Sequence, residues 1–61
     1  MRLFEFLEAF DFETDVKVFD EKSIILYDGK VGDVPHRLSM RRWYEARAEN
    51  DTLEVIVKIG G

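Results

Sequence analysis

The stretch VKVFDEKSIILYDGKVGDV, residues 16–34, decides the fold of this chain. Its apolar positions are mostly β-branched or aliphatic, and polar pairs stand where the chain has to reverse. We therefore expect three short strands, over residues 16–20, 23–28 and 30–34. The second reversal is Asp28-Gly29, a strong hairpin signal because such a turn has positive φ at both central residues. The stretch predicts an antiparallel meander whose second strand, apolar on both faces, is central.

The segments on either side of this stretch predict one helix and two further strands. Residues 2–10 carry their apolar side chains on one stripe at helical spacing, namely Leu3, Phe4, Phe6, Leu7 and Phe10. A fourth strand is expected over residues 41–48 and a fifth over residues 52–59. The fifth strand alternates, with inward-facing Leu53, Val55, Val57 and Ile59. Ile56 is the exception, because it is an apolar residue on the outward side.

Together these segments predict a single α+β domain over residues 1–61. All the expected turns are short, so neighbouring strands should be antiparallel. We expect a short N-terminal helix packed on a curled antiparallel sheet of four to five strands, similar to a small open barrel. One short helix covers only part of one face. The sheet should therefore either close around the helix or leave a face open to a partner.

The composition limits what can hold so small a chain together. A domain of 61 residues buries only about 60% of the surface of its unfolded chain. The chain has no cysteine, which excludes a disulfide and a thiolate ligand, and its one histidine, His36, cannot form a zinc site by itself. We therefore expect no metal and no cofactor, and a core made of apolar side chains alone.

The formal net charge is −4, and the acidic residues concentrate in the first half of the chain. Nucleic-acid phosphates repel an acidic chain, so general binding of DNA or RNA is disfavoured. No apolar run approaches the ~20 residues of a membrane span. Glu5 and Glu8 interrupt the apolar N-terminal segment, which is therefore not typical of a signal peptide. These features predict a cytoplasmic protein without membrane attachment.

The first candidate site is the arginine-aromatic segment, whose members are Arg37, Arg41, Arg42, Trp43, Tyr44 and Arg47. Arginine among aromatic residues is used to stack on bases and hold phosphates, and it is also enriched in protein–protein hot spots. Because strand residues alternate, the same segment would divide between two faces, with Trp43 or Tyr44 in the core. Core, protein contact and nucleic-acid contact all stay open, and the core interpretation is favoured.

A second candidate is the acidic group Glu8, Asp11, Glu13 and Asp15. Its spacing does not match a calcium-binding loop, and solvated charge is the favoured interpretation. A catalytic arrangement is not evident. His36 follows a proline in an expected loop, and the only serines, Ser23 and Ser39, stand outside nucleophile motifs. We therefore expect no enzymatic activity.

The order of segments resembles short uncharacterised proteins of phages, prophages and integrative elements in Gram-positive gut bacteria. Those proteins begin with a helix similar to LFEFLEAF, followed by segments similar to TDVKVFD, ILYDGKVGDVP and TLEVIVK. The resemblance covers nearly the whole chain, but its motifs are structural. It implies a mobile-element origin and a cytoplasmic location, and it transfers no catalytic residue.

These observations predict a small non-enzymatic interaction module that binds a protein partner, or itself, through a sheet face or edge. Two alternatives remain open: an acidic inhibitor that mimics nucleic acid at a basic protein site, and a nucleic-acid binder that uses the arginine-aromatic segment. The candidate interaction residues are that segment and Ile56. Because neither metal nor disulfide is available and Ile56 interrupts a polar face, we also expect a symmetric homodimer.

Overall fold

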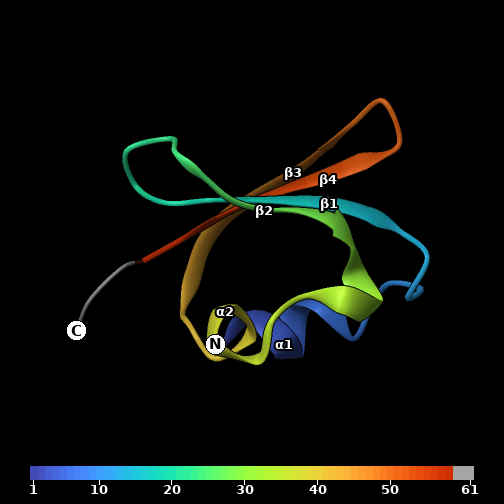
Figure 1. The fold of residues 1–61 in the computed structure, drawn as a ribbon, viewed down its shortest axis with the longest axis horizontal. Helices are drawn as coiled ribbons and strands as arrows, with labels where there is room; N and C mark the ends of the chain where they lie inside the picture. Colours follow the sequence, from blue (N-terminus) through green and yellow to red (C-terminus); the bar gives the residue numbers. More distant parts are fainter. Residues whose placement is uncertain (59–61) are drawn as a thin grey trace.

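The computed structural model describes residues 1–58, whose arrangement is shown in Figure 1. The elements follow one another as α1 (Leu3–Leu7), β1 (Asp15–Phe19), β2 (Ile25–Lys30), the 3₁₀ turn η1 (Val31–Asp33), α2 (His36–Ser39), β3 (Trp43–Glu49) and β4 (Thr52–Val57). Ile59 and Gly60-Gly61, expected as the end of the last strand and a frayed terminus, lie outside the described residues. In residues 1–58 no helix has the length and apolar character needed to cross a membrane.

The strands form one open, curled sheet in the order β2-β1-β4-β3. The predicted α+β class, with a short helix on a small curled sheet, is confirmed. The two outer pairs, β1 with β2 and β3 with β4, are antiparallel as expected. The central pair, β1 with β4, is parallel, so the sheet is mixed and the expectation of antiparallel neighbours is wrong there. The physical reason is that β4 reaches β1 through a long connection, and no tight turn dictates its direction.

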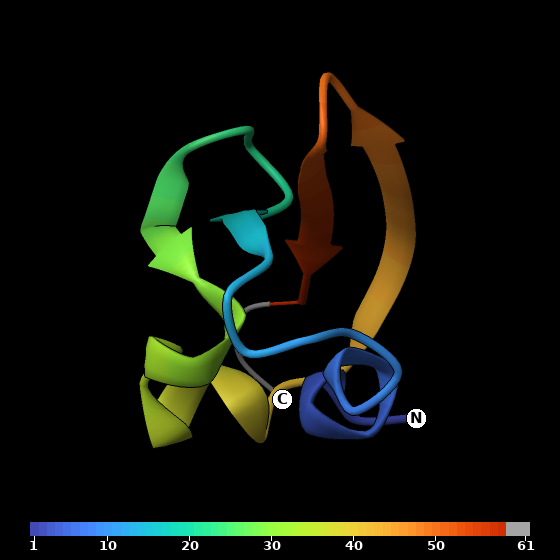
Figure 2. The ribbon, with the colours of Figure 1, turned by 90° about the vertical axis from the view of Figure 1, so that its right-hand side faces the viewer.

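Both helices cover the same face of the sheet, which we call the inner face (Figures 1 and 2). Side chains alternate along β1 and β4, and every second one points to this face. The buried core lies between the helices and the two central strands, and its members are Leu3, Leu7, Val16, Val18, Val31, Leu53, Val55 and Val57. The opposite face, here called the outer face, carries no helix in the part of the chain that the structure describes.

Helix α1 is shorter than the predicted segment of residues 2–10. It begins after Arg2, whose backbone N–H donates to Oε1 of Glu5 at 2.9 Å. The Leu3 N–H donates to the carbonyl oxygen of Arg41 at 2.8 Å, which ties the helix to the start of β3. Leu3 and Leu7 are buried, so the helix packs on the core as predicted, while Phe4 is exposed.

Asp28-Gly29 is not a turn, and this prediction is wrong. Both residues lie inside β2, where Asp28 pairs with Lys17 and Gly29 with Val16. The φ of Gly29 lies outside the left-handed region. A Cβ at this position would lie 2.7 Å from Oη of Tyr27, so any other residue would displace the phenol.

The strand expected over residues 30–34 is also wrong. β2 ends at Lys30, and residues 31–33 form η1. The backbone N–H groups of Val31 and Gly32 donate to the carbonyl oxygens of Thr14 at 2.9 Å and Phe12 at 3.0 Å. These bonds hold the segment against the chain that precedes β1. The chain therefore turns toward α2 instead of returning along β2.

β2 is an edge strand, not the central strand that its apolar faces predicted. Ile24, Ile25 and Leu26 are 57%, 51% and 37% exposed. The central positions belong to β1 and β4, whose inner residues contact the helices. The sequence pattern could not distinguish a central strand from an edge strand. A run of apolar residues reads the same whether protein or solvent lies beside it.

Candidate functional site

The outer face is built by the residues that alternate with the core. On β1 they include Lys17 and Phe19, and on β4 they include Glu54 and Ile56. All four are half-buried although no helix in residues 1–58 lies over them, because they pack on one another across the sheet. Ile56 was expected on the side opposite Leu53, Val55 and Val57, and it lies there.

One row of the outer face is apolar. The register aligns Ile25 of β2 with Phe19 of β1, and Phe19 with Ile56 of β4. Glu45 of β3 aligns with Ile56 and ends the row at the far edge. We call Ile25, Phe19 and Ile56 the apolar row. Cross-strand neighbours of this kind stabilise a sheet by side-chain contact, and here the contact also leaves a continuous apolar strip open on one side.

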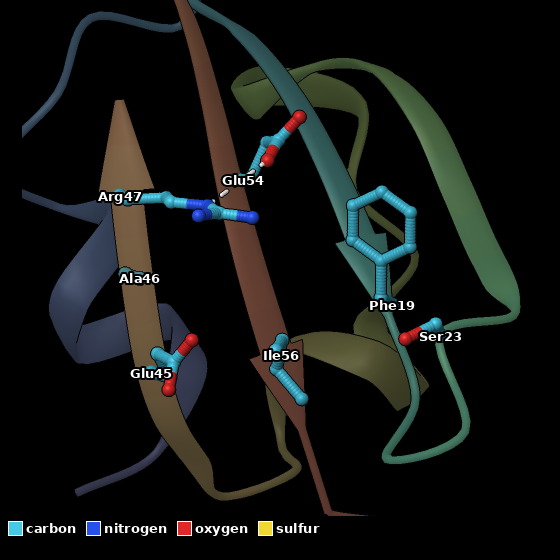
Figure 3. Close-up of a pocket in the computed structure, with 7 residues that line it drawn as sticks. All are labelled: Phe19, Ser23, Glu45, Ala46, Arg47, Glu54 and Ile56. Atoms are coloured by element: carbon cyan, nitrogen blue, oxygen red, sulfur yellow. Dashed lines mark ion pairs between the residues drawn. The ribbon is translucent and has the colours of Figure 1, made fainter. Parts of the chain in front are cut away.

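The neighbouring row is fully charged, with alternating sign. The register aligns Asp28 with Lys17, Lys17 with Glu54, and Glu54 with Arg47. We call these four residues the charged row. The Nε of Arg47 lies 3.4 Å from Oε1 of Glu54, an ion pair drawn as a dashed line in Figure 3. Opposite charges on adjacent strands stabilise the sheet, so the row serves the fold before any partner binds.

A third row continues the pattern toward the other end of the sheet. Lys30 of β2 aligns with Asp15 of β1, and its Nζ lies 2.7 Å from Oδ1 of Asp15. This hydrogen bond and the carboxylate charge raise the pKa of Lys30. Thr52 and Glu49 complete the row on β4 and β3. The outer face therefore carries one apolar row beside two polar rows.

A shallow hollow of about 120 Å³ lies where the apolar and charged rows meet. Figure 3 shows the residues that line it, namely Phe19, Ser23, Glu45, Ala46, Arg47, Glu54 and Ile56. Ligand pockets of proteins measure roughly 300–1,000 Å³. The hollow has room for one side chain of a partner, and not for a cofactor.

The arginine-aromatic segment does not form one surface. Arg37 and Arg41 line a second hollow of about 280 Å³ beside the β2 edge, together with Leu26, Pro35 and Leu38. Arg41 is half-buried, and its Nη1 donates to the Lys58 carbonyl oxygen at 3.3 Å. Arg42 is exposed and pairs with Arg2 through an isolated bridge. Arg47 belongs to the charged row on the outer face.

The two aromatic residues of this segment also separate. Trp43 is half-buried, and its ring centroid lies 4.2 Å from that of Phe6 under the sheet. Its indole Nε1 has no hydrogen-bond partner among residues 1–58. Tyr44 is exposed, because the β3–β4 register shifts between Trp43 and Glu45. The bulge sends the two rings to different surroundings, so they offer no joint stacking platform.

The remaining candidate residues lie apart from the outer face hollow. Glu8, Asp11 and Glu13 are exposed, and Asp15 is paired with Lys30. His36 is the first residue of α2 and is exposed. Within residues 1–58, no group of three or more His, Asp or Glu side chains is placed to hold a metal ion.

The sequence interpretation missed most of the outer face. Glu54 was expected to face outward, as it does, but Lys17 and Phe19 had no assigned side, and Ile25 and Asp28 were assigned to a central strand and a turn. Alternation in VKVF and TLEVIV does indicate that each pair shares a face. To place these residues in common rows, one needs the register between β1 and β4. Those strands are far apart in the chain, so no local pattern gives it.

No protein-family model matches this chain, and no curated protein or solved structure was found to be similar to it.

Proposed function

We propose that this chain is a small interaction module that binds another polypeptide chain through the outer face of its sheet. The observation that supports this is the apolar row, which no helix of residues 1–58 covers. Ile25 is 51% exposed at one end of it. Exposed apolar groups that are contiguous and bordered by charges are typical of protein-binding surfaces.

The hollow supports the same proposal. Phe19 and Ile56 supply apolar walls, and Glu45, Arg47 and Glu54 supply charges around them. A partner side chain that enters can exchange water for apolar contact while the surrounding charges select its neighbours. The size of the hollow suits a side-chain anchor of the kind that dominates small interfaces.

Ile56→Lys tests this proposal. We expect the variant to lose binding, because a lysine in the apolar row places a charge where an apolar contact is needed. The immobilised parent protein, the variant and a control are compared for the chains that they retain from a lysate of the cells that produce the protein. Phe12→Lys is the control, because Phe12 is 76% exposed and does not line the outer hollow.

The expected result is a chain retained by the parent and by Phe12→Lys, and lost by Ile56→Lys. Equal retention by all three proteins would show that another surface binds. Thermal melting of each variant ensures that a loss of binding does not arise from unfolding.

A second candidate function uses the exposed carboxylates of Glu8, Asp11 and Glu13. None of the three has an ion pair among the described residues. Such free negative charge suits an inhibitor that occupies the nucleic-acid site of a basic protein. Binding of this kind falls as salt rises. Binding through these carboxylates should be weakened in the double variant Glu8→Gln with Glu13→Gln and unchanged in Ile56→Lys. Binding through the outer face should show the opposite pattern.

A further inference from the structure

We propose that the partner of the outer face is a second copy of this chain, stacked face to face about a two-fold axis. The axis runs parallel to the strands and passes between β1 and β4. The inference rests on the proposed function, because it uses the same face, and it adds the identity and the register of the partner.

The geometry of such an axis follows from the strand order. Rotation about a line parallel to the strands keeps each residue at its height along the strand and reverses the order of the strands. β1 then lies over β4 of the second copy, and β2 over β3. Each row of the outer face therefore meets the same row of the other copy in reverse order.

The charged row is complementary to its own reverse. Asp28 lies over Arg47 of the second copy, and Lys17 over Glu54 of the second copy. The two-fold axis repeats both contacts, so all four positions of the row face an opposite charge. In the third row, Lys30 likewise lies over Glu49 of the second copy. Opposite potentials across an interface select the partner and the register.

The apolar row meets itself in the same arrangement. Phe19 lies over Ile56 of the second copy, and the axis repeats this contact on its other side, at one end of the face. Glu45 lies over Ile25 of the second copy at the two edges, where its carboxylate reaches solvent. The interface then has an apolar row at one end of the face and a charged row along its middle, so the apolar contacts supply burial and the charges supply the register.

The other in-plane axis gives the opposite result. A two-fold axis that runs across the strands at the height of the charged row, the middle one of the three rows, places each strand over its own copy. Asp28 then lies over Asp28 of the second copy, and Lys17 over Lys17 of the second copy. Like charges meet along the whole row, which disfavours this stacking. The charge pattern therefore distinguishes between the two symmetric ways to stack the outer faces.

The size of the face indicates a weak dimer. Strands about 4.8 Å apart and residues about 3.3 Å apart make the face of four strands and five residues roughly 20 Å by 16 Å. Specific interfaces of small area form weak or transient complexes. Removing water from the charged row costs part of the Coulomb energy. We expect a dissociation constant in the micromolar range. The charges should determine the register of the two copies more than the affinity between them.

A charge-swap cycle at Asp28 and Arg47 tests the proposal. The two residues stand on opposite edge strands, about 14 Å apart at three strand spacings, so they do not meet within one chain. In the dimer each faces the other across the axis. Asp28→Lys and Arg47→Glu should each weaken dimerisation about tenfold, because each creates repulsion on both sides of the axis. The double variant should return to within about threefold of the parent, because the charges match again.

Sedimentation equilibrium from micromolar to millimolar concentration gives the dissociation constants. Glu21→Lys and Arg37→Glu serve as controls, since both residues are exposed off the outer face and the substitutions change the net charge equally. Both should leave dimerisation unchanged. Circular dichroism confirms folding. Lys17→Glu with Glu54→Lys provides a second cycle if a variant of the first unfolds.

Three results would overturn the proposal: a parent protein that stays monomeric at millimolar concentration, a dimer that the single swaps leave unchanged, and a double swap that does not restore dimerisation. The proposed function is judged separately. A monomeric parent that retains another chain, and loses it on Ile56→Lys, keeps the interaction module and removes the second copy as its partner.

Discussion

Asp20 shows how one side chain shapes the connection between two strands. It is 6% exposed, and its Oδ1 accepts the backbone N–H groups of Lys22 at 2.8 Å and Ile24 at 3.0 Å. Ser23, between them, has a φ of 67°. The two hydrogen bonds hold the loop in this left-handed turn, which a residue with a Cβ adopts only at a cost. The reversal predicted over residues 20–23 therefore depends on this carboxylate.

We expect Asp20→Ala to lower the free energy of unfolding by about 1–3 kcal/mol, because two backbone donors lose their partner. Urea titration followed by circular dichroism measures the change. Glu21→Ala is the control, since Glu21 is exposed in the same loop, and it should stay within about 0.5 kcal/mol of the parent. Equal losses in the two variants would contradict the assigned role of Asp20.

The space available at Gly29 is limited by Tyr27 on the same strand. A Cβ at this position would lie 2.7 Å from Oη and 3.0 Å from Cζ of Tyr27. The Tyr27 hydroxyl donates to the Lys30 carbonyl oxygen at 2.7 Å. Burial and the nearby charge of Asp33 raise the pKa of Tyr27, so the hydroxyl keeps its proton as a donor.

Gly29→Ala should destabilise the fold by about 1 kcal/mol, because the phenol has to move and its hydrogen bond is lost. In a Tyr27→Val background the same substitution should be neutral or slightly stabilising, because alanine loses less backbone entropy than glycine. Thermal melts of the four proteins form the cycle. An equal cost of Gly29→Ala in both backgrounds would refute the steric explanation.

At the scale of elements, α1 is too short to be stable alone and depends on what it covers. Leu3 and Leu7 point into the core, and Phe6 lies against Trp43. The helix in turn shields the inner residues of β1 and β4 from water. It is therefore part of the core and not a detachable tail.

We expect Leu7→Ala to cost about 2–5 kcal/mol, since it removes buried methyl groups and leaves a cavity. Phe6→Ala should fall in the same range because it exposes one side of Trp43. Phe12→Ala is the control, because Phe12 is an exposed apolar residue after the same helix, and it should change stability by less than about 0.5 kcal/mol. A Leu7→Ala variant that melts with the parent would show that α1 is dispensable.

At the scale of the whole molecule, the helices of the described residues cover one of the two faces of the sheet. The inner face takes the buried apolar residues of the part of the chain that the structure describes, and the outer face carries the apolar row beside charges. Without a disulfide, the small core leaves little stability to spare. Burial of the outer face against another chain would add to it by mass action.

We therefore expect the melting temperature of the parent to rise with protein concentration, and that of Ile56→Lys to stay constant. The variant should remain folded when dilute, because Ile56 points away from the core. Differential scanning calorimetry over a hundredfold range of concentration measures both. A melting temperature of the parent that does not depend on concentration would contradict self-association through this face.

From the sequence alone, the α+β class, the N-terminal helix on the core and the inward set Leu53, Val55 and Val57 could be predicted. These follow from spacing along one segment, where periods of 3.6 and 2 separate helix from strand. The outward side of Ile56 follows from the same local rule.

Only the tertiary structure decided which strands are neighbours. The parallel pairing of β1 with β4 places Phe19 against Ile56 and Lys17 against Glu54, and so creates the apolar and charged rows. It also moves β2 to an edge and makes Asp28 part of a strand. The β1–β4 contacts join residues more than thirty positions apart, and their register depends on packing of the whole chain. No pattern within one segment encodes that, which is why the outer face became evident only in three dimensions.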